Sequence, residues 1–427
     1  MGLGLYIKAE IPKTGLFKKF RKPANMLTDI ANELKRLLPE ELQRSVLGTQ
    51  TIENGIVVQL HPAEEPVEIT SKDHTIFCGA KTNSAGPGYH AFLVDSLRSI
   101  EEKLKFEWLW HDINDEIGDE TGYYDTGDFG ELQKEMLKWL RAISRSLIEH
   151  NECEHQMICM PLGYSVIVDP SVISSMGFWS KEWLKEVANS ELSDLINKGP
   201  EFFPWWEKGF GAEFYSKCGL TKAWVDLPWH TFDNKFELEQ YQFVLDCFQR
   251  ARSLDNNIPI PEKEIELIKE YMNADTLAPA PKPEGIGFKK RLMERNLTGS
   301  WTANIPGYFY DNLENDGTTS VYWFEDRTIR GSSILVQSKS GRLVSADKLI
   351  DDKPDSPEIL EFAENQLKGW AKVEKTKEKG QEYWCLQGKM AVTNSLCFVT
   401  ICFDKEEDKD WAIKTWKSVK MPEPKQE

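Results

Sequence analysis

The sequence predicts an α+β protein built from two different halves, and three observations lead to this prediction. Short β-rich runs alternate with long amphipathic helices in the first half, β-rich runs dominate the second, and a proline-rich stretch lies between them. The 427 residues also exceed the ~100–200 of one ordinary domain. We therefore expect an N-terminal α/β part (1–175), a helical part (176–275), a linker (276–296) and a C-terminal antiparallel sheet covered by helices (297–420).

In the first part, the strongest periodicity lies at 26–38, where Leu and Ile recur every three or four residues as on one face of a helix. A strand at 3–11 precedes this helix. We further expect strands at 55–60, 67–70, 75–78, 157–160 and 164–168, and helices at 89–103 and 129–148.

The character becomes helical after residue 179, with helices expected at 181–195, 207–218, 236–254 and 261–272. The run Phe-Phe-Pro-Trp-Trp at 202–206, together with 251–255, is similar to runs in uncharacterised bacterial proteins. The next stretch carries Pro279, Pro281 and Pro283. Because proline fixes φ and removes a donor, this stretch predicts an extended linker.

The C-terminal part is expected to contain strands at 321–324, 328–336, 369–374, 382–390 and 396–403, with helices at 358–367 and 409–419. The runs Tyr-Trp-Cys-Leu-Gln-Gly-Lys (383–389) and Asp-Trp-Ala-Ile-Lys-Thr-Trp (410–416) resemble the Mog1/PsbP-like α/β/α sandwich. The resemblance implies a binding module, because members of that fold mostly act as binding modules.

Charge and cysteine usage narrow the classes of partner. The chain has 69 acidic and 52 basic side chains, a net charge of −17, and shows no basic stripe, so nucleic acid is not an expected partner. No apolar run is long enough to cross a membrane, and the eight cysteines are scattered, so we expect a cytoplasmic protein. A basic protein is the partner that this acidity favours.

The densest charge feature is a run of seven carboxylates with no Lys or Arg among them. Mutual repulsion favours either a divalent cation or a basic partner there, and a solvated acidic loop is the alternative. The spacing does not match an EF-hand, and the last member starts a capping box with Glu131. The run comprises Asp112, Asp115, Glu116, Asp119, Glu120, Asp125 and Asp128.

A glycine-rich loop at 79–88 precedes an expected helix, and such a position suits an anion. We expect Ser84, Gly86 and Gly88 to contribute, although no P-loop pattern is present and the glycines alternatively shape a turn. His90 and His111 are candidate catalytic bases, with Asp112 beside them. Burial against a carboxylate is the alternative for His111.

Two further groups of residues, a His/Cys cluster and an aromatic-rich stretch, bear on binding. His150, Cys153, His155 and Cys159 fall within ten residues, but their spacing matches no zinc ladder, so no metal centre is expected. Trp205 and Trp206 lie in an aromatic-rich stretch and are candidate anchors of a protein interface, with core packing as the alternative.

Three hypotheses follow from these observations. The favoured one is a non-enzymatic protein-binding module, either a toxin-neutralising (immunity-like) protein or an adaptor. The second is a metal- or phosphate-dependent hydrolase in the N-terminal part, using the glycine-rich loop and the two histidines. The third is a scaffold that joins two folded parts.

Overall fold

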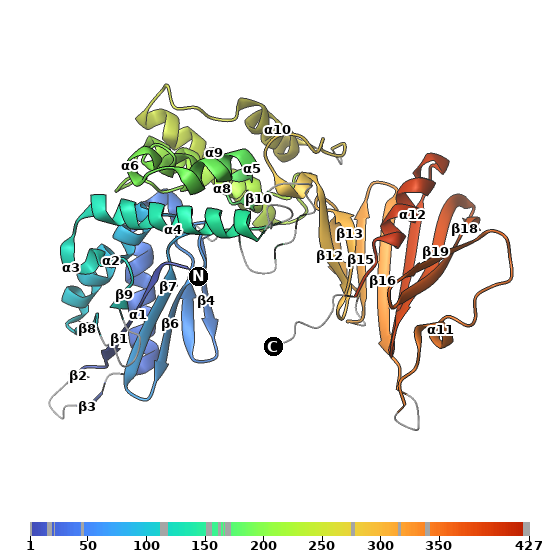
Figure 1. Ribbon diagram of the computed structural model, residues 1–427, viewed down its shortest axis with the longest axis horizontal. Coiled ribbons are helices and arrows are strands. Elements are labelled where there is room, and N and C mark those ends of the chain that lie inside the picture. The colour runs from blue at the N-terminus through green and yellow to red at the C-terminus, as the bar shows by residue number, and fades with distance from the viewer. Residues whose placement is uncertain are drawn as a thin grey trace.

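The computed structural model describes residues 2–14, 19–20, 22–43, 47–111, 118–150, 156–160, 164, 166, 172–274, 278–314, 317–337 and 342–421. An antiparallel sheet lies toward each end of the chain, and a group of helices lies between them in sequence (Figure 1). The expected α+β class, with an antiparallel C-terminal sheet, is confirmed.

The N-terminal sheet has the strand order β4-β5-β6-β7-β1-β8, and β9 pairs with the free end of β1. All these pairings are antiparallel, so the expected α/β part is a layer of helices on an antiparallel sheet. A small hairpin of β2 (Lys13–Thr14) and β3 (Lys19–Phe20) follows β1. The strands are β1 (Gly4–Glu10), β4 (Thr49–Ile52), β5 (Gly55–Val58), β6 (Val67–Lys72), β7 (Thr75–Lys81), β8 (Trp108–Leu109) and β9 (Gly118–Asp119).

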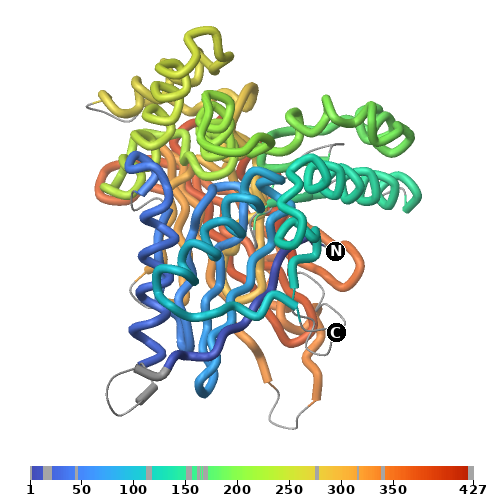
Figure 2. The backbone as a smooth tube through the Cα atoms, turned by 90° about the vertical axis from the view of Figure 1, so that its left-hand side faces the viewer, coloured from blue at the N-terminus to red at the C-terminus, as the bar shows by residue number. Residues whose placement is uncertain are grey.

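Helices α1 (Pro23–Arg36) and α2 (Pro87–Leu104) cover one face of this sheet, the face turned away from the C-terminal part (Figures 1 and 2). Side chains alternate across a strand, so Leu5, Ile7 and Ala9 of β1 are buried beneath the helices. Burial of each large aliphatic side chain contributes about 1.5–3 kcal/mol. The alternate residues of β1 point to the other face, which carries no helix.

The helical part begins after α3 (Tyr123–Thr126) and α4 (Phe129–Glu149), whose N-cap Asp128 accepts a hydrogen bond from the Glu131 N–H, as the capping pattern predicts. The helix expected at 181–195 is broken at Ser190, which is extended, and the one expected at 207–218 begins only after Gly209 and Gly211. The elements are β10 (Val172–Ser174), β11 (Gly177–Trp179), α5 (Lys181–Asn189), α6 (Leu192–Leu195), α7 (Gly199–Phe202), α8 (Ala212–Val225), α9 (Lys235–Leu254) and α10 (Glu262–Asn273).

The proline-rich stretch is irregular but anchored. Residues 278–287, all of them described, form no helix or strand, as the prolines predict. Its end is nevertheless packed on the helical part: Phe288 is fully buried, and the Ile286 N–H donates to Glu264. Gly287, at φ 114°, lies against Trp229, where a Cβ would come within 2.2 Å of the indole nitrogen. The second half of the expected linker is therefore part of a packed core.

The C-terminal sheet has the order β14-β15-β16-β20-β19-β18-β17 and is antiparallel throughout. Helix α12 (Lys409–Lys417) and the hairpin of β12 (Leu292–Thr298) and β13 (Trp301–Pro306) cover one face. One helical turn, α11 (Ala346–Leu349), packs at one end of the other face. The strands are β14 (Tyr310–Leu313), β15 (Thr319–Phe324), β16 (Arg327–Leu335), β17 (Ile359–Glu364), β18 (Leu367–Glu378), β19 (Gln381–Val392) and β20 (Ser395–Phe403).

The prediction of a helix at 358–367 is wrong, because residues 359–364 form the edge strand β17. Asn365 adopts a left-handed conformation (φ 51°), which suits a tight turn between β17 and β18. The strand pairs from Ile359 with Lys372 to Glu364 with Leu367. Cross-strand hydrogen bonds with β18 therefore override the local helical preference of this segment.

None of the helices in the described ranges combines the length and apolar character that a membrane crossing requires.

Candidate functional site

The backbone N–H groups of the glycine-rich loop bind a carboxyl group, and that group is a side chain of the protein. Oε2 of Glu64 accepts hydrogen bonds from the backbone N–H groups of Ser84 and Ala85, each at 2.9 Å. Glu64 lies twenty residues earlier in the chain, which is why the loop sequence gave no sign of it. An external phosphate would have to displace this carboxylate.

The two glycines expected to bind an anion serve packing instead. The Gly86 N–H donates to Thr82, and the Gly88 N–H donates to the carbonyl of Trp205. A Cβ at Gly88 would lie 2.2 Å from the Trp205 ring, and one at Gly86 would lie 2.7 Å from Phe203. The prediction of Gly86 and Gly88 as anion ligands is therefore wrong, because close approach of aromatic side chains explains both glycines.

Glu64 is an unusual carboxyl group because it is buried in an apolar environment. Burial raises its pKa to about 7, although the N–H groups of Ala85 and Ser84 lower it in part. Glu64 is 5% exposed, so it has no open path to a substrate. We attribute to it the structural role of holding the loop that starts α2.

His90 is fully buried on α2 and is held by a closed network. Its Nδ1 lies 2.9 Å from Oγ1 of Thr82, and its Nε2 lies 3.0 Å from both Oγ1 of Thr121 and Oδ1 of Asp119. The two hydroxyls donate elsewhere, to the carbonyl of Leu3 and to Asp119. Both ring nitrogens are therefore engaged, Nδ1 by Thr82 and Nε2 by Thr121 and Asp119.

Asp119 is the acidic partner in this network. Burial alone would raise its pKa, but His90, the Tyr124 N–H and Thr121 outweigh burial and hold the pKa well below its usual range. Since neither His90 nor the Asp119 side chain reaches solvent, His90 does not meet the access that a catalytic base needs. The candidate role of His90 as a base is corrected to a structural role in a buried hydrogen-bond network, and Asp119 is not available to a partner.

His111 lies apart from this network, on the surface. Its Nε2 is 3.0 Å from Oδ1 of Asp125, and more than half of each side chain is exposed. An exposed pair of this kind contributes little to stability. Asp112, Asp115 and Glu116 lie outside the described residues, so the expected convergence of His111 with Asp112 and the expected cation at the acidic run stay predictions.

The prediction that Trp205 and Trp206 anchor a protein interface is wrong. They are 1% and 5% exposed, respectively, and pack inside the core beside α2 and α7. Trp205 also donates through its indole nitrogen to the carbonyl of Gly209. The aromatic density of this stretch fills a core, as the alternative interpretation held.

The candidates for zinc are divided between described and undescribed parts of the chain. Cys153 and His155 lie outside the described residues, while Nδ1 of His150 contacts the Ser146 carbonyl and Cys159 lies beside Asn83. Within the residues that the structure describes, no three His, Cys, Asp or Glu side chains gather in a way that would hold a metal ion.

The surface with the most distinctive chemistry is the helix-free face of the N-terminal sheet, which we call the uncovered face. Tyr6 and Leu109 are 44% and 42% exposed there, and Tyr6 stacks on Phe77 with ring centroids 6.1 Å apart. Gly79 stands opposite Tyr6, so the ring lies over a strand position that has no side chain. The outward-pointing residues include Tyr6, Lys8, Glu10, Val57, Glu68, Thr70, Phe77 and Leu109.

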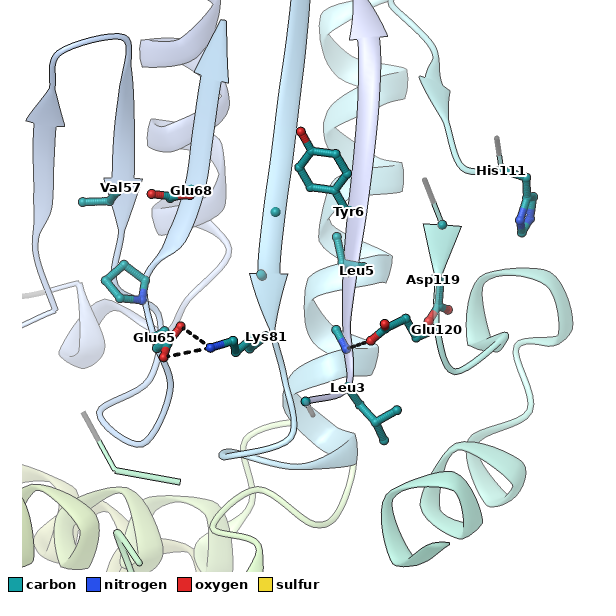
Figure 3. Close-up of a pocket in the computed structure, with 16 residues that line it drawn as sticks. Leu3, Leu5, Tyr6, Val57, Glu65, Glu68, Lys81, His111, Asp119 and Glu120 are labelled. Carbon is teal, nitrogen blue, oxygen red and sulfur yellow. Dashed lines mark hydrogen bonds and ion pairs between the residues drawn. The ribbon is translucent and has the colours of Figure 1, made fainter. Parts of the chain in front are cut away.

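Two shallow hollows flank these aromatic residues. The first, of about 840 Å³, lies over β6, β7 and β1, and Figure 3 shows Tyr6 beside it with Glu65, Glu68 and Glu120 around it. Glu65 is paired with Lys81, and Glu120 accepts from the Gly4 N–H. The second hollow, of about 960 Å³, lies over β1, β7 and the β8 edge and contains Glu10, Phe77 and Leu109 among its lining.

Carboxylates dominate this surface. Apart from the buried Asp119, seven carboxylates and three lysines line the two hollows. Among the described residues, neither Glu10 nor Glu68 takes part in an ion pair, and both are exposed. Carboxylates therefore outnumber lysines around Tyr6 and Phe77. Sequence reasoning missed these residues, although the alternation of buried and polar residues along β1 was a signal for an exposed strand face.

Comparisons with known proteins leave the chain without an assigned family. No family model matches, and no curated protein matches. Among solved structures, the chain is similar to a protein from Bacteroides thetaiotaomicron VPI-5482, with 10% identity, a TM-score of 0.24, and coverage of 30% of this chain and 47% of that one. The chain thus spans just under half of that neighbour. A similarity this low supports no conclusion about fold or function, and the Mog1/PsbP-like resemblance stays a prediction.

Proposed function

We propose that this chain is a non-enzymatic protein-binding module that engages a basic protein through the uncovered face. The observation that carries the proposal is the stacked pair of Tyr6 and Phe77, with Leu109 beyond Lys8 on the same face and carboxylates around them. Two of these carboxylates, Glu10 and Glu68, form no ion pair with any described residue. A toxin-neutralising protein and an adaptor are the two variants of this function, and the cytoplasm is the location we propose.

The chemistry of the face resembles that of protein interfaces. Aromatic residues at the centre of an interface supply contact area at low entropic cost, and polar residues form the rim. Tyr6 is held in place by its stacking on Phe77, so little conformational freedom is lost when a partner covers it.

The charge of the face selects the kind of partner. Carboxylates around the patch attract a basic protein and accelerate its association, and they repel acidic or nucleic-acid surfaces. Glu10 and Glu68 are exposed and have no cation within the described chain, so a partner's lysine or arginine gains an ion pair without breaking an existing one.

The hydrolase alternative has less support. Its proposed base His90 is buried with both ring nitrogens engaged, and its proposed anion loop is occupied by Glu64. A hydrolase of the N-terminal part would have to rely on His111 and the acidic run instead.

The test compares a face variant with a matched control. The face variant carries Tyr6→Ala, Glu10→Lys and Glu68→Lys, and the control carries Phe236→Ala, Glu266→Lys and Glu270→Lys on the exposed surface of α9 and α10. Both sets remove one exposed aromatic ring and reverse two carboxylates, so the net charge changes equally. Proteins captured by the wild-type chain are purified, and their affinities for the three chains are measured at about 50 mM and about 500 mM salt.

We expect a basic partner whose affinity falls at least about a hundredfold with the face variant and stays unchanged with the control. Raising the salt concentration should lower the affinity of the wild-type chain more than that of the face variant, because salt screens the carboxylates that the variant lacks. Equal losses with both variants, or a partner with an acidic surface, would contradict the proposal. Hydrolysis of phosphate esters by the purified chain, abolished by His111→Ala, would favour the alternative.

A further inference from the structure

Two cysteines face each other in the middle of the C-terminal sheet. Cys385 of β19 and Cys402 of β20 are direct cross-strand partners, and their sulfur atoms lie 3.7 Å apart. The neighbouring residues Leu386 and Ile401 belong to the core beneath α12. Since side chains alternate, the two sulfurs lie on the opposite face of the sheet, which α12 does not cover.

This placement matches what a disulfide requires. Directly opposed residues of antiparallel strands have Cα atoms about 4.5–5.5 Å apart, and a disulfide accepts about 4.4–6.8 Å. Side-chain rotation can therefore bring the sulfurs into bonding distance while the strands keep their register. The pair needs no movement of the backbone to close.

The environment of Cys402 favours reaction with an electrophilic sulfur. Cys402 is partly exposed, whereas Cys385 is 5% exposed. The pKa of Cys402 is lowered by its hydrogen bond with Cys385 and by the charge of Arg330, against the effect of burial. The pKa of Cys385 is raised by the same hydrogen bond and by burial. Cys402 is therefore the first thiolate of the pair to form.

A second cysteine pair provides an internal contrast. Cys218 of α8 and Cys247 of α9 are also hydrogen-bonded, and hydrogen bonds from Cys247 and His61 outweigh burial and lower the pKa of Cys218 to about 6. Both cysteines are buried, at 0% and 2% exposure. The two pairs thus share proximity and an acidic thiol, and they differ in access.

We propose that Cys385 and Cys402 form a reversible thiol-oxidation site whose substrate is a low-molecular-weight disulfide of the glutathione type. The Cys402 thiolate attacks one sulfur of that disulfide, forms a mixed disulfide and releases one thiolate. The Cys385 thiolate then attacks the Cys402 sulfur and releases the second thiolate. Two protein thiols are oxidised to one disulfide, the small disulfide is reduced to two thiols, and the two protons pass to the released thiolates.

The test treats the folded, reduced chain with oxidised glutathione and maps the products by mass spectrometry after the remaining thiols are alkylated. We expect a Cys385–Cys402 cross-link that dithiothreitol reverses, while Cys218 and Cys247 remain reduced. The Cys385→Ser variant should accumulate the mixed disulfide at Cys402, because the resolving thiol is missing. The Cys402→Ser variant should react at least about tenfold more slowly, because Cys385 is buried and its thiolate is disfavoured.

A cross-link at Cys218–Cys247 before one at Cys385–Cys402 would overturn the proposal, and so would a wild-type chain whose Cys385 and Cys402 stay reduced. If either serine variant fails to fold, the wild-type peptide map decides by itself. The site is independent of the proposed partner binding, because it lies on the other sheet.

Discussion

The two large sheets of this protein are both antiparallel and covered mainly on one face, and they differ in the chemistry of the opposite face. In the C-terminal sheet, the charged residues of that face are mostly paired, as in Lys372 with Glu374 and Arg330 with Glu314. On the uncovered face of the N-terminal sheet, Glu10 and Glu68 have no such partner in the described part of the chain. The comparison teaches that two antiparallel sheets can differ in how the charges of one face are paired, and it is this difference on which the proposed interface rests.

The largest expected effect tests whether the covered face of the C-terminal sheet supplies its stability. Trp416 of α12 is fully buried and packs over Gly388, where a Cβ would come within 2.5 Å of the indole. Trp416→Ala should lower the free energy of unfolding by about 3–5 kcal/mol, measured by urea denaturation. Leu335→Ala, at a residue 80% exposed, is the control and should change it by less than about 0.5 kcal/mol. Similar losses for both would remove the distinction between covered and uncovered residues.

In the N-terminal sheet, the corresponding test removes the partner of His90. Asp119→Ala should cost about 3–5 kcal/mol, because it removes the acceptor of the hydrogen bonds from Thr121 and the Tyr124 N–H and takes a partner from the buried His90. Asp125→Ala, which removes the exposed partner of His111, should cost at most about 1 kcal/mol. Because the pKa of Asp119 is depressed in the folded state, its contribution is present above its unfolded pKa of about 3.9 and is lost as the pH falls through the folded value. Equal costs for the two substitutions would show that the buried network around Asp119 contributes no more to stability than the exposed pair of Asp125 and His111.

Glu64 should change the free energy of unfolding with pH in the direction opposite to that of Asp119. Its folded pKa of about 7 lies above the unfolded value of about 4.3, so the folded chain binds the extra proton and gains stability as the pH falls from about 7 to about 4.3. The gain should amount to about 3–4 kcal/mol. Glu64→Gln keeps an oxygen acceptor for the Ser84 N–H and should abolish this part of the pH dependence, as urea denaturation at several pH values would reveal. An unchanged pH profile in the variant would refute the assignment.

The smallest effect is expected on the uncovered face itself. Tyr6→Ser removes an exposed ring, and we expect a change of no more than about 1 kcal/mol in the free energy of unfolding, since the side chain is 44% exposed and stacks on Phe77. Phe203→Ala, which removes a fully buried ring, should cost about 3–5 kcal/mol by comparison. A large loss for Tyr6→Ser would mean that the face is a structural element of the sheet and would weaken the proposed interface.

Long periodic elements could be predicted from the sequence, whereas contacts between distant residues could not. The helices expected at 89–103, 129–148 and 236–254 are found at Pro87–Leu104, Phe129–Glu149 and Lys235–Leu254, because their spacing of apolar residues is a local signal. The prediction of a helix at 358–367 is wrong because pairing with β18 determines the conformation of this segment. The sequence alone also left open whether Trp205 packs in a core or anchors an interface, since both uses favour aromatic residues.

The candidate site shows the same division. The sequence predicts an external anion at the glycine-rich loop, and it does not reveal Glu64 there, because Glu64 reaches Ser84 and Ala85 through the tertiary fold. The patch of Tyr6, Phe77 and Leu109 assembles from three strands, and the pairing of β7 and β8 with β1 brings it together. Each strand alone shows only one exposed apolar residue, which is ordinary for a protein surface.

The carboxyl group of Glu64 acts as a ligand that is covalently part of the chain, and it occupies the two backbone N–H donors of Ser84 and Ala85. Its effective concentration at the Ser84 and Ala85 amides is fixed by the fold, so the start of α2 stays ordered whatever the supply of metabolites in the cell. Shortening this side chain to alanine would leave an empty cradle of two backbone donors. Formate or acetate added to such a chain would be the natural chemical rescue, restoring from solution what the residue normally provides.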